Sequence, residues 1–352
     1  MNMSCSFIID LQNSTTLFPY VYLPYELVLF KFVMPWIILI GITSNSTFIW
    51  TVIRVSSLHT STFIYLFGLA CTDLFTLVGF GMSITNALLS PVRFGNTPTL
   101  QGITEILKLF SFITSTFFVT LVSLERYLAI CHPLQYRLIK GTKRTIKLSL
   151  ITILLSVGIT STTAVQNFGT RSVWCFVWPS DVHFNNYPRE ITMMTANFDL
   201  SLLYYKITTL AYVTINVLLL TSNCYMYTMI LITFRRRKQN KQLQLSAELE
   251  RNIHQIATMV ITNGLVFFSC TSILIARMAY SALYLFGVRF LNQYQITGFE
   301  RVLDFFVISN ASVNPLIYFI TNQSYRRALM ASITTYKRKM DNTVITSISS
   351  RS

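Results

Sequence analysis

The sequence is poor in charged residues. Charged side chains make up only 12% of its 352 residues, whereas hydrophobic side chains make up 52% and the mean hydropathy is +0.52. A soluble domain carries about 25% charged residues, so this composition excludes a soluble globular protein. We therefore expect the lipid bilayer to be its solvent.

Acidic residues are the scarcer charged class. The chain has 13 Asp and Glu against 28 Lys and Arg, which gives a net charge of +15. The basic residues lie between hydrophobic stretches and form neither one long tract nor one amphipathic face. We interpret them as signals of membrane topology and expect no nucleic-acid partner.

Metal-ligating patterns are also lacking. The six cysteines show no Cys-x-x-C spacing, and the hydrophobic stretches contain no paired histidines or His/Asp cluster. The sequence thus predicts no metal centre and no enzyme. Residues 1–26 lack the pattern of a cleavable signal peptide, and no internal repeat suggests a transporter built from duplicated halves.

Long hydrophobic stretches, in contrast, recur along the chain. A bilayer core of about 30 Å takes roughly 20 apolar residues per helix. Stretches of that length predict seven helices, at residues 27–54, 61–89, 100–131, 143–166, 200–234, 252–284 and 295–320. The expected fold is therefore all-α, a seven-transmembrane helix bundle.

The basic residues orient this bundle. They concentrate in the connections after the first, third and fifth spans and after the seventh, which the positive-inside rule places in the cytoplasm. We expect an extracellular N-terminus (1–26), a seven-transmembrane domain (27–320), and an amphipathic helix with a cytoplasmic tail (321–352) in the plasma membrane. Asn2 and Asn13 begin glycosylation triplets on the extracellular side.

A short eighth helix is predicted after the last span. Tyr325, Leu329, Ile333 and Tyr336 recur at helical spacing among basic residues, as in a helix lying on an anionic membrane surface. The alternative is a frayed basic tail.

Ionisable residues inside the predicted spans mark candidate functional sites, because a charge in the bilayer is costly. Asp73, Glu125 and Arg126 are such residues. Arg126 lies at the cytoplasmic end of the third span, where a guanidinium neutralised by Glu125 could exchange this neighbour for another partner. In the alternative interpretation, Arg126 only extends to the lipid headgroups.

Four short motifs resemble those of rhodopsin-like G-protein-coupled receptors. They lie in the order and the spans typical of that family: Asn45, Leu69-Ala70-Cys71-Thr72-Asp73, Ser123-Leu124-Glu125-Arg126-Tyr127-Leu128-Ala129-Ile130 and Asn314-Pro315-Leu316-Ile317-Tyr318. The resemblance implies a receptor whose third, sixth and seventh helices rearrange to admit a heterotrimeric G protein.

The resemblance also implies roles for individual residues. Glu125, Arg126 and Tyr127 would form the coupling switch, with Tyr225 or Tyr227 and Tyr318 moving towards Arg126. A polar cluster that could hold a structural sodium ion would comprise Asp73, Ser115, Asn310 and Asn314. Alternatively, Asp73 only ties helices together through hydrogen bonds.

Departures from the family pattern limit what can be carried over. The fourth span has no Trp, the fifth lacks the usual proline, and residues 267–273 contain no Trp-x-Pro hinge. Gln101 stands where the family has the third-helix cysteine that pairs with the second extracellular loop, which leaves Cys175 without that partner. Since Cys5 is the other extracellular thiol, we expect a Cys5–Cys175 disulfide.

Two features of the sequence bear on the class of ligand. They are the second extracellular loop and the charged residues near the extracellular ends of the spans. Trp174-Cys175-Phe176 resembles the corresponding loop of prostanoid receptors, although Phe305 stands where those receptors have a carboxylate-binding arginine. The candidate pocket residues are Lys108, Arg277, Trp174, Phe176, Arg301 and Asp304.

Cations among them suit an acidic lipid of prostaglandin type. The alternatives are that these charges form an ion-pair network, or that the ligand is a small peptide. A seven-helix transporter or channel fits less well, because few ionisable groups lie in the spans.

Overall fold

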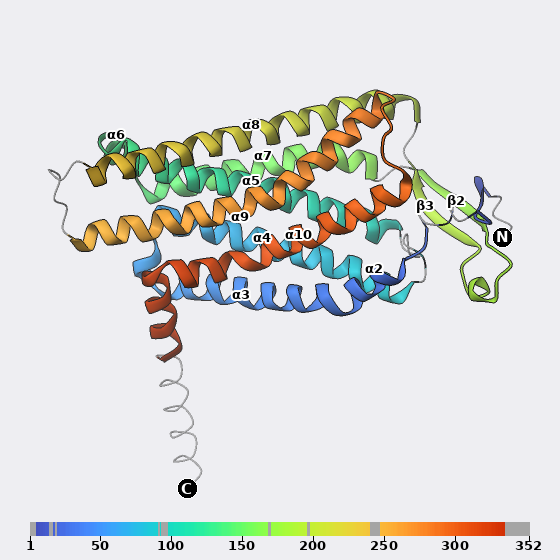
Figure 1. Ribbon diagram of the computed structural model, residues 1–352, viewed down its shortest axis with the longest axis horizontal. Helices are drawn as coiled ribbons and strands as arrows, with labels where there is room; N and C mark the ends of the chain where they lie inside the picture. Colours follow the sequence, from blue (N-terminus) through green and yellow to red (C-terminus); the bar gives the residue numbers. More distant parts are fainter. Residues whose placement is uncertain are drawn as a thin grey trace, which may run out of the picture.

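A computed structural model describes residues 5–13, 17, 20–90, 92, 98–167, 170–195, 198–239 and 247–334. Its long helices run side by side in one elongated bundle, and a small sheet lies beyond one end (Figure 1). We call the end next to this sheet the sheet end. The opposite end, where the third span finishes, is called the Arg126 end.

Seven helices of the described residues are long and apolar enough to cross a membrane, as the sequence predicted. The first span runs from α2 (Pro24–Val28) through a π-helical segment, η1 (Leu29–Val33), into α3 (Met34–Arg54). The other six are α4 (Ser61–Leu89), α5 (Pro98–Cys131), α7 (Thr142–Asn167), α8 (Phe198–Gln239), α9 (Ala247–Leu285) and α10 (Gln293–Thr321). All predicted boundaries lie within five residues of the observed ones.

Two buried apolar clusters hold these helices together. The cluster at the Arg126 end includes Phe48, Phe118 and Tyr318, and the cluster nearer the sheet end includes Met34 and Leu77. Both lie inside the bundle, whereas other apolar side chains face outward, as a protein solvated by lipid requires.

Two short helices connect the first four spans. α6 (Pro133–Ile139) begins with a proline at its first position, where the missing N–H costs no helical hydrogen bond. The turn η2 (Ser56–Leu58) joins α3 to α4. Hydrophobicity alone did not predict α6, because the helix is too short to cross a membrane.

A three-stranded sheet covers the sheet end. Its strands are β1 (Phe7–Asp10), β2 (Thr170–Val177) and β3 (Glu190–Thr195), with the turn η3 (Val182–Phe184) between the last two. β2 is central, parallel to β1 and antiparallel to β3, and Phe7 lies opposite Trp174. The all-α prediction therefore holds for the bundle, but it missed this sheet, because pairing between residues as far apart in the chain as Phe7 and Trp174 leaves no local signal.

The predicted eighth helix is present at residues 323–334 and leaves α10 at a steep angle (Figure 1). The side chain of Asn322 accepts a hydrogen bond of 2.9 Å from the backbone N–H of Tyr325 at the turn. Tyr325 is buried and Leu329 packs on the core, whereas Ile333 is exposed. Tyr336 lies outside the described residues.

Candidate functional site

The buried carboxylate of Glu125 is the centre of the Arg126 end. Only 2% of Glu125 is exposed, and it accepts a hydrogen bond of 2.8 Å from the hydroxyl of Tyr136 in α6. Arg144, in the first turn of α7, lies 3.5 Å from the other carboxylate oxygen. Burial and the adjacent carboxylate raise the pKa of Tyr136 to about 12, so this hydroxyl remains a donor at physiological pH.

Arg126 has a different partner from the one expected. Its guanidinium donates to the hydroxyl of Thr62, at the beginning of α4, and it forms no ion pair with the residues that the structure describes. The direct partner of Arg126 is therefore Thr62, while Glu125 acts on Arg126 through its charge without forming an ion pair. Consecutive residues of a helix point about 100° apart, so the two side chains reach different neighbours.

Of the two candidate tyrosines in α8, Tyr227 faces the bundle and Tyr225 faces outward. Tyr225 is 56% exposed and lies beside the ring of Tyr127, at a centroid distance of 6.0 Å. Tyr227 is buried, and its hydroxyl accepts a hydrogen bond of 2.6 Å from Ser123 of α5. Residues two apart on a helix lie on nearly opposite faces, so only one of this pair can point inward.

Tyr227 also packs directly against α9. Gly264 lies under its ring, and a Cβ atom at Gly264 would overlap the Tyr227 hydroxyl and ring atoms. This close contact joins α8 to α9, while the Ser123 hydrogen bond joins α8 to α5. One side chain thus ties together three helices of the bundle.

Three of the four residues of the predicted polar cluster, Asp73, Ser115 and Asn314, meet inside the bundle. Asn314 donates a hydrogen bond of 2.7 Å to the buried carboxylate of Asp73, and Ser115 also interacts with this carboxylate. Asn310 is buried one helical turn from Asn314. The side-chain oxygens of Asn310 and Asn314 have no hydrogen-bond partner among the described residues, so oxygen donors remain for a cation or water.

A proline inside α10 lies beside this cluster. Pro315 has no backbone N–H, so the carbonyl of Ala311 loses its usual helical donor. The side-chain amide of Asn45 replaces that donor, at 2.9 Å from the Ala311 oxygen. The hydroxyl of Ser44 reaches the next carbonyl, that of Ser312, at 3.2 Å. α3 thereby supplies the hydrogen bonds to α10 around its proline.

At the sheet end, the predicted cations are paired with carboxylates. Lys108 bonds Glu105 three residues earlier on α5. Arg277 of α9 lies 2.7 Å from Glu300 of α10. These contacts correspond to the ion-pair network that the sequence left open as an alternative to a carboxylate-binding site.

Arg301 is the centre of this network. It contacts Asp304 at 2.5 Å, Glu26 at 3.3 Å and Glu300 at 3.9 Å, and its guanidinium lies over the ring of Phe30. Glu26 is fully buried and also accepts a hydrogen bond of 2.7 Å from the backbone of residue 23. Arg301 therefore fastens the start of the first span to α10.

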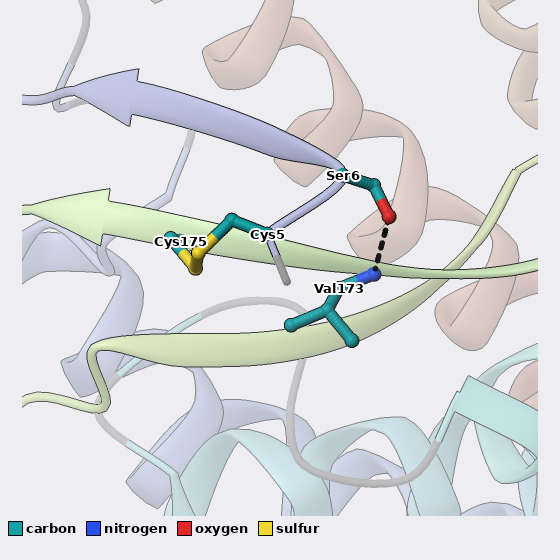
Figure 2. Close-up of a disulfide and its surroundings, with 4 residues drawn as sticks. All are labelled: Cys5, Ser6, Val173 and Cys175. Carbon is teal, nitrogen blue, oxygen red and sulfur yellow. Dashed lines mark hydrogen bonds between the residues drawn. A yellow bond between two sulfur atoms is a disulfide. The ribbon is translucent and has the colours of Figure 1, made fainter. Parts of the chain in front are cut away.

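A disulfide joins two segments of the sheet at this end. Cys5 and Cys175 are bonded, with Cα atoms 5.8 Å apart, and the hydroxyl of Ser6 accepts a hydrogen bond from the backbone of Val173 beside them (Figure 2). This is the pairing that the missing third-helix cysteine suggested. The bond attaches the N-terminal strand β1 to β2 across 170 residues.

The two aromatic candidates of β2 lie two residues apart on the strand and therefore on the same face of the sheet, where Trp174 packs at the margin of the cluster that contains Phe176. Phe176 is buried with Leu11 and Ile191, whereas Trp174 is partly exposed and donates a hydrogen bond of 2.8 Å to Ser172. Phe176 thus belongs to the core of the sheet. The glycosylation candidate Asn13 is exposed, and Asn2 lies outside the described residues.

Sequence reasoning missed several partners at the Arg126 end, chiefly Thr62, Tyr136, Arg144 and Gly264. Each lies on a different element from the residue it contacts, and their residue types are common near helix ends. One signal was available: a buried carboxylate requires hydrogen-bond donors, so a donor for Glu125 could have been sought in the segment after the third span, where Tyr136 lies.

Comparisons with known proteins agree with this geometry. A family model described as 7 transmembrane receptor (rhodopsin family) matches residues 44–318. The thyrotropin-releasing hormone receptor of Gallus gallus is 28% identical over 170 residues, which cover 47% of this chain and 38% of that receptor. The matched segment thus spans less than half the length of this curated relative.

Proposed function

The chain belongs to the rhodopsin family of seven-transmembrane receptors, and we propose that it transmits the binding of a small peptide at its sheet end to a heterotrimeric G protein at its Arg126 end. The motif resemblance is thereby confirmed, and the protein is a multi-pass membrane receptor and not an enzyme. The sheet end is extracellular in this proposal, and the Arg126 end is cytoplasmic.

The observation that carries the proposed coupling is the set of partners at the Arg126 end. Glu125 is held by Tyr136 and Arg144, and Arg126 is held by Thr62. Arg126 itself forms no ion pair with a carboxylate among the described residues. Its guanidinium can therefore bind an incoming partner without breaking an ion pair. A hydrogen bond to a neutral hydroxyl is weaker than a buried ion pair, which favours such an exchange.

Tyr227 would couple this exchange to helix movement. Separation of α9 from α8 would free the Tyr227 ring from Gly264, and the hydrogen bond to Ser123 of α5 would then be the remaining contact to break. The released side chain could then approach Arg126 and stabilise an open arrangement. This route requires no Trp-x-Pro hinge in α9, which the sequence lacks.

A structural sodium ion fits the polar cluster. Asp73 supplies a buried carboxylate, and Ser115, Asn310 and Asn314 supply hydroxyl and amide oxygens. Oxygen ligands of this kind suit a hard cation. A bound sodium ion would supply positive charge that offsets the burial of Asp73.

The charges at the sheet end favour a peptide over an acidic lipid. Within the ion-pair network of this end, Glu26, Glu105, Glu300 and Asp304 pair with Lys108, Arg277 and Arg301. A lone lipid carboxylate would have to compete with the carboxylates that these three cations already contact. A peptide offers amino groups and amides that can bind acids and bases together. The similarity to a receptor named for a releasing hormone supports this choice.

The test is a ligand screen in cells that express the receptor with G-protein dissociation sensors. We expect small peptides with a free amino or basic group to activate it, and an epitope placed before Cys5 to be stained on intact cells. Arg126→Ala is expected to keep peptide binding and lose the G-protein signal. Activation by acidic lipids alone, abolished by Lys108→Gln with Arg277→Gln at normal expression, would overturn the peptide proposal.

A further inference from the structure

An ordered turn follows α9 at the sheet end. Gly287 has a positive φ of 88°, and the backbone N–H groups of Gly287 and Val288 bond carbonyls in the last turn of α9, at 3.0 and 3.1 Å. This is the Schellman arrangement that ends many helices. Phe290 then packs back on Tyr280 in an edge-to-face contact, with ring centroids 4.8 Å apart. The turn therefore holds its side chains in defined positions.

Two cations lie over aromatic rings at this turn. Lys206 of α8 lies over the ring of Phe286, 5.5 Å from its centroid, and Arg289 lies over the ring of Tyr284 at 4.9 Å. Neither cation forms an ion pair with a residue that the structure describes. No Asp or Glu stands within three residues of either one in the sequence. A cation over a ring keeps its other N–H donors, so both can bind an anion.

These cations lie at the level where two spans leave the bilayer. The span of α8 begins at Lys206 and the span of α9 ends at Tyr284. The two helix ends lie side by side (Figure 1). Below them, Ile207, Leu210 and Val217 of α8 face outward, with exposed fractions of 58%, 53% and 41%. From Lys206 to Val217 the helix rises by about 16 Å, which is about half of a hydrocarbon core of ~30 Å.

We propose that this surface binds one phosphocholine lipid in the leaflet at the sheet end. The phosphate would accept hydrogen bonds from Lys206 and Arg289, and an acyl chain would lie along the outward apolar residues of α8. The quaternary ammonium has no N–H, so its partner is an aromatic face, which the exposed ring of Phe290 supplies. We call this surface the turn patch. It comprises Lys206, Tyr284, Phe286, Arg289 and Phe290.

A small anion or an acidic peptide fits the turn patch less well. Either would use the two cations, but it would leave the apolar row of α8 and the ring of Phe290, which is 63% exposed, uncovered. A phosphocholine lipid supplies an anion, a cation and an apolar chain in the order in which the patch presents their partners. Lipid binding needs neither an agonist nor a G protein, so the inference stands apart from the proposed coupling.

The site can be tested on the full chain in detergent micelles with a phosphatidylcholine probe that carries a diazirine and an alkyne on one acyl chain. We expect saturable labelling of α8 between Ile207 and Val217, competed by unlabelled phosphatidylcholine. Diacylglycerol has the same chains and no headgroup, and phosphatidylglycerol has the phosphate and no choline. Each should compete at least threefold more weakly.

Two sets of substitutions separate the parts of the headgroup. Lys206→Gln with Arg289→Gln should weaken competition by phosphatidylcholine about tenfold, because both donors to a charged phosphate are lost. Phe290→Leu should weaken competition by phosphatidylcholine about threefold and leave competition by phosphatidylglycerol unchanged, because only the choline contact is lost.

Lys31→Gln with Arg189→Gln is the matched control, since it removes the same charge from two exposed cations at the sheet end. This variant should compete as the wild type does. The thermal unfolding midpoint of each variant reports whether it is folded. Equal competition by phosphatidylcholine and either comparison lipid would overturn the proposal. Labelling spread evenly over all spans would also overturn it, as would wild-type competition in folded Lys206→Gln with Arg289→Gln.

Discussion

The hydroxyl of Tyr136 donates a hydrogen bond of 2.8 Å to Glu125, which belongs to the third span but is separated from Tyr136 by 11 residues. Glu125 is almost completely buried, so this bond and the 3.5 Å contact with Arg144 satisfy a carboxylate that water cannot reach. Loss of a donor to a buried charge costs about 1–3 kcal/mol.

Tyr136→Phe should therefore destabilise the closed arrangement and raise agonist-independent signalling. Phenylalanine keeps the ring and removes only the donor. The measurement is basal G-protein dissociation per receptor at the cell surface, for which we expect a severalfold increase. Tyr284→Phe, on an exposed tyrosine at the sheet end, is the control and should leave basal signalling at the wild-type level. Basal signalling unchanged in Tyr136→Phe would argue against a restraining role for this bond.

Gly264→Ala should displace Tyr227, because the added methyl group would occupy the space of its hydroxyl. Overpacking of this kind costs about 1–3 kcal/mol, so we expect a lower thermal unfolding midpoint together with raised basal signalling. Gly158→Ala is a matched control, since no atom lies within 4 Å of a Cβ atom there. Adding Tyr227→Leu should restore the stability of Gly264→Ala. If it does not, the loss of stability does not come from a steric overlap with Tyr227.

Arg301→Met should be strongly destabilising, because Arg301 is a counter-ion of the fully buried Glu26. Removing one partner of a buried pair costs about 3–5 kcal/mol. The double variant Arg301→Met with Glu26→Gln should recover part of this loss in a thermal unfolding assay. If the loss of stability in the double variant equalled the sum of the losses in the two single variants, Arg301 and Glu26 would not be energetically coupled.

The Cys5–Cys175 disulfide predicts a specific redox response. A native disulfide typically contributes about 2–4 kcal/mol, so Cys5→Ser and Cys175→Ser should each lower the unfolding midpoint. The double variant should resemble either single one, and a mild reductant should destabilise the wild type but not the double variant. Alkylation followed by mass spectrometry provides the direct check, in which two free thiols would contradict the bond.

Sodium should stabilise the receptor through Asp73. Replacing sodium with a large organic cation is expected to lower the unfolding midpoint of the wild type but not that of Asp73→Asn, which keeps the shape and removes the charge. Asn310→Ala should weaken the sodium response without abolishing it, because it removes one amide oxygen. An identical sodium response in wild type and Asp73→Asn would show that the ion does not bind at this cluster.

The sequence by itself determined the membrane class, the seven spans and the placement of Asp73 and Asn314 in facing helices. These features are local or depend on hydrophobicity, which the bilayer imposes on every span. It also indicated the disulfide, since the family pattern left Cys175 without its usual partner.

Only the tertiary structure decided which side chains and strands contact one another. Helix rotation selects Tyr227 over Tyr225 and turns Glu125 towards Tyr136 while Arg126 turns towards Thr62. The pairing of Arg301 with Glu26 and that of β1 with β2 join segments far apart in the chain. Such contacts depend on how helices and strands pack together in three dimensions, and no local pattern of residues encodes that arrangement.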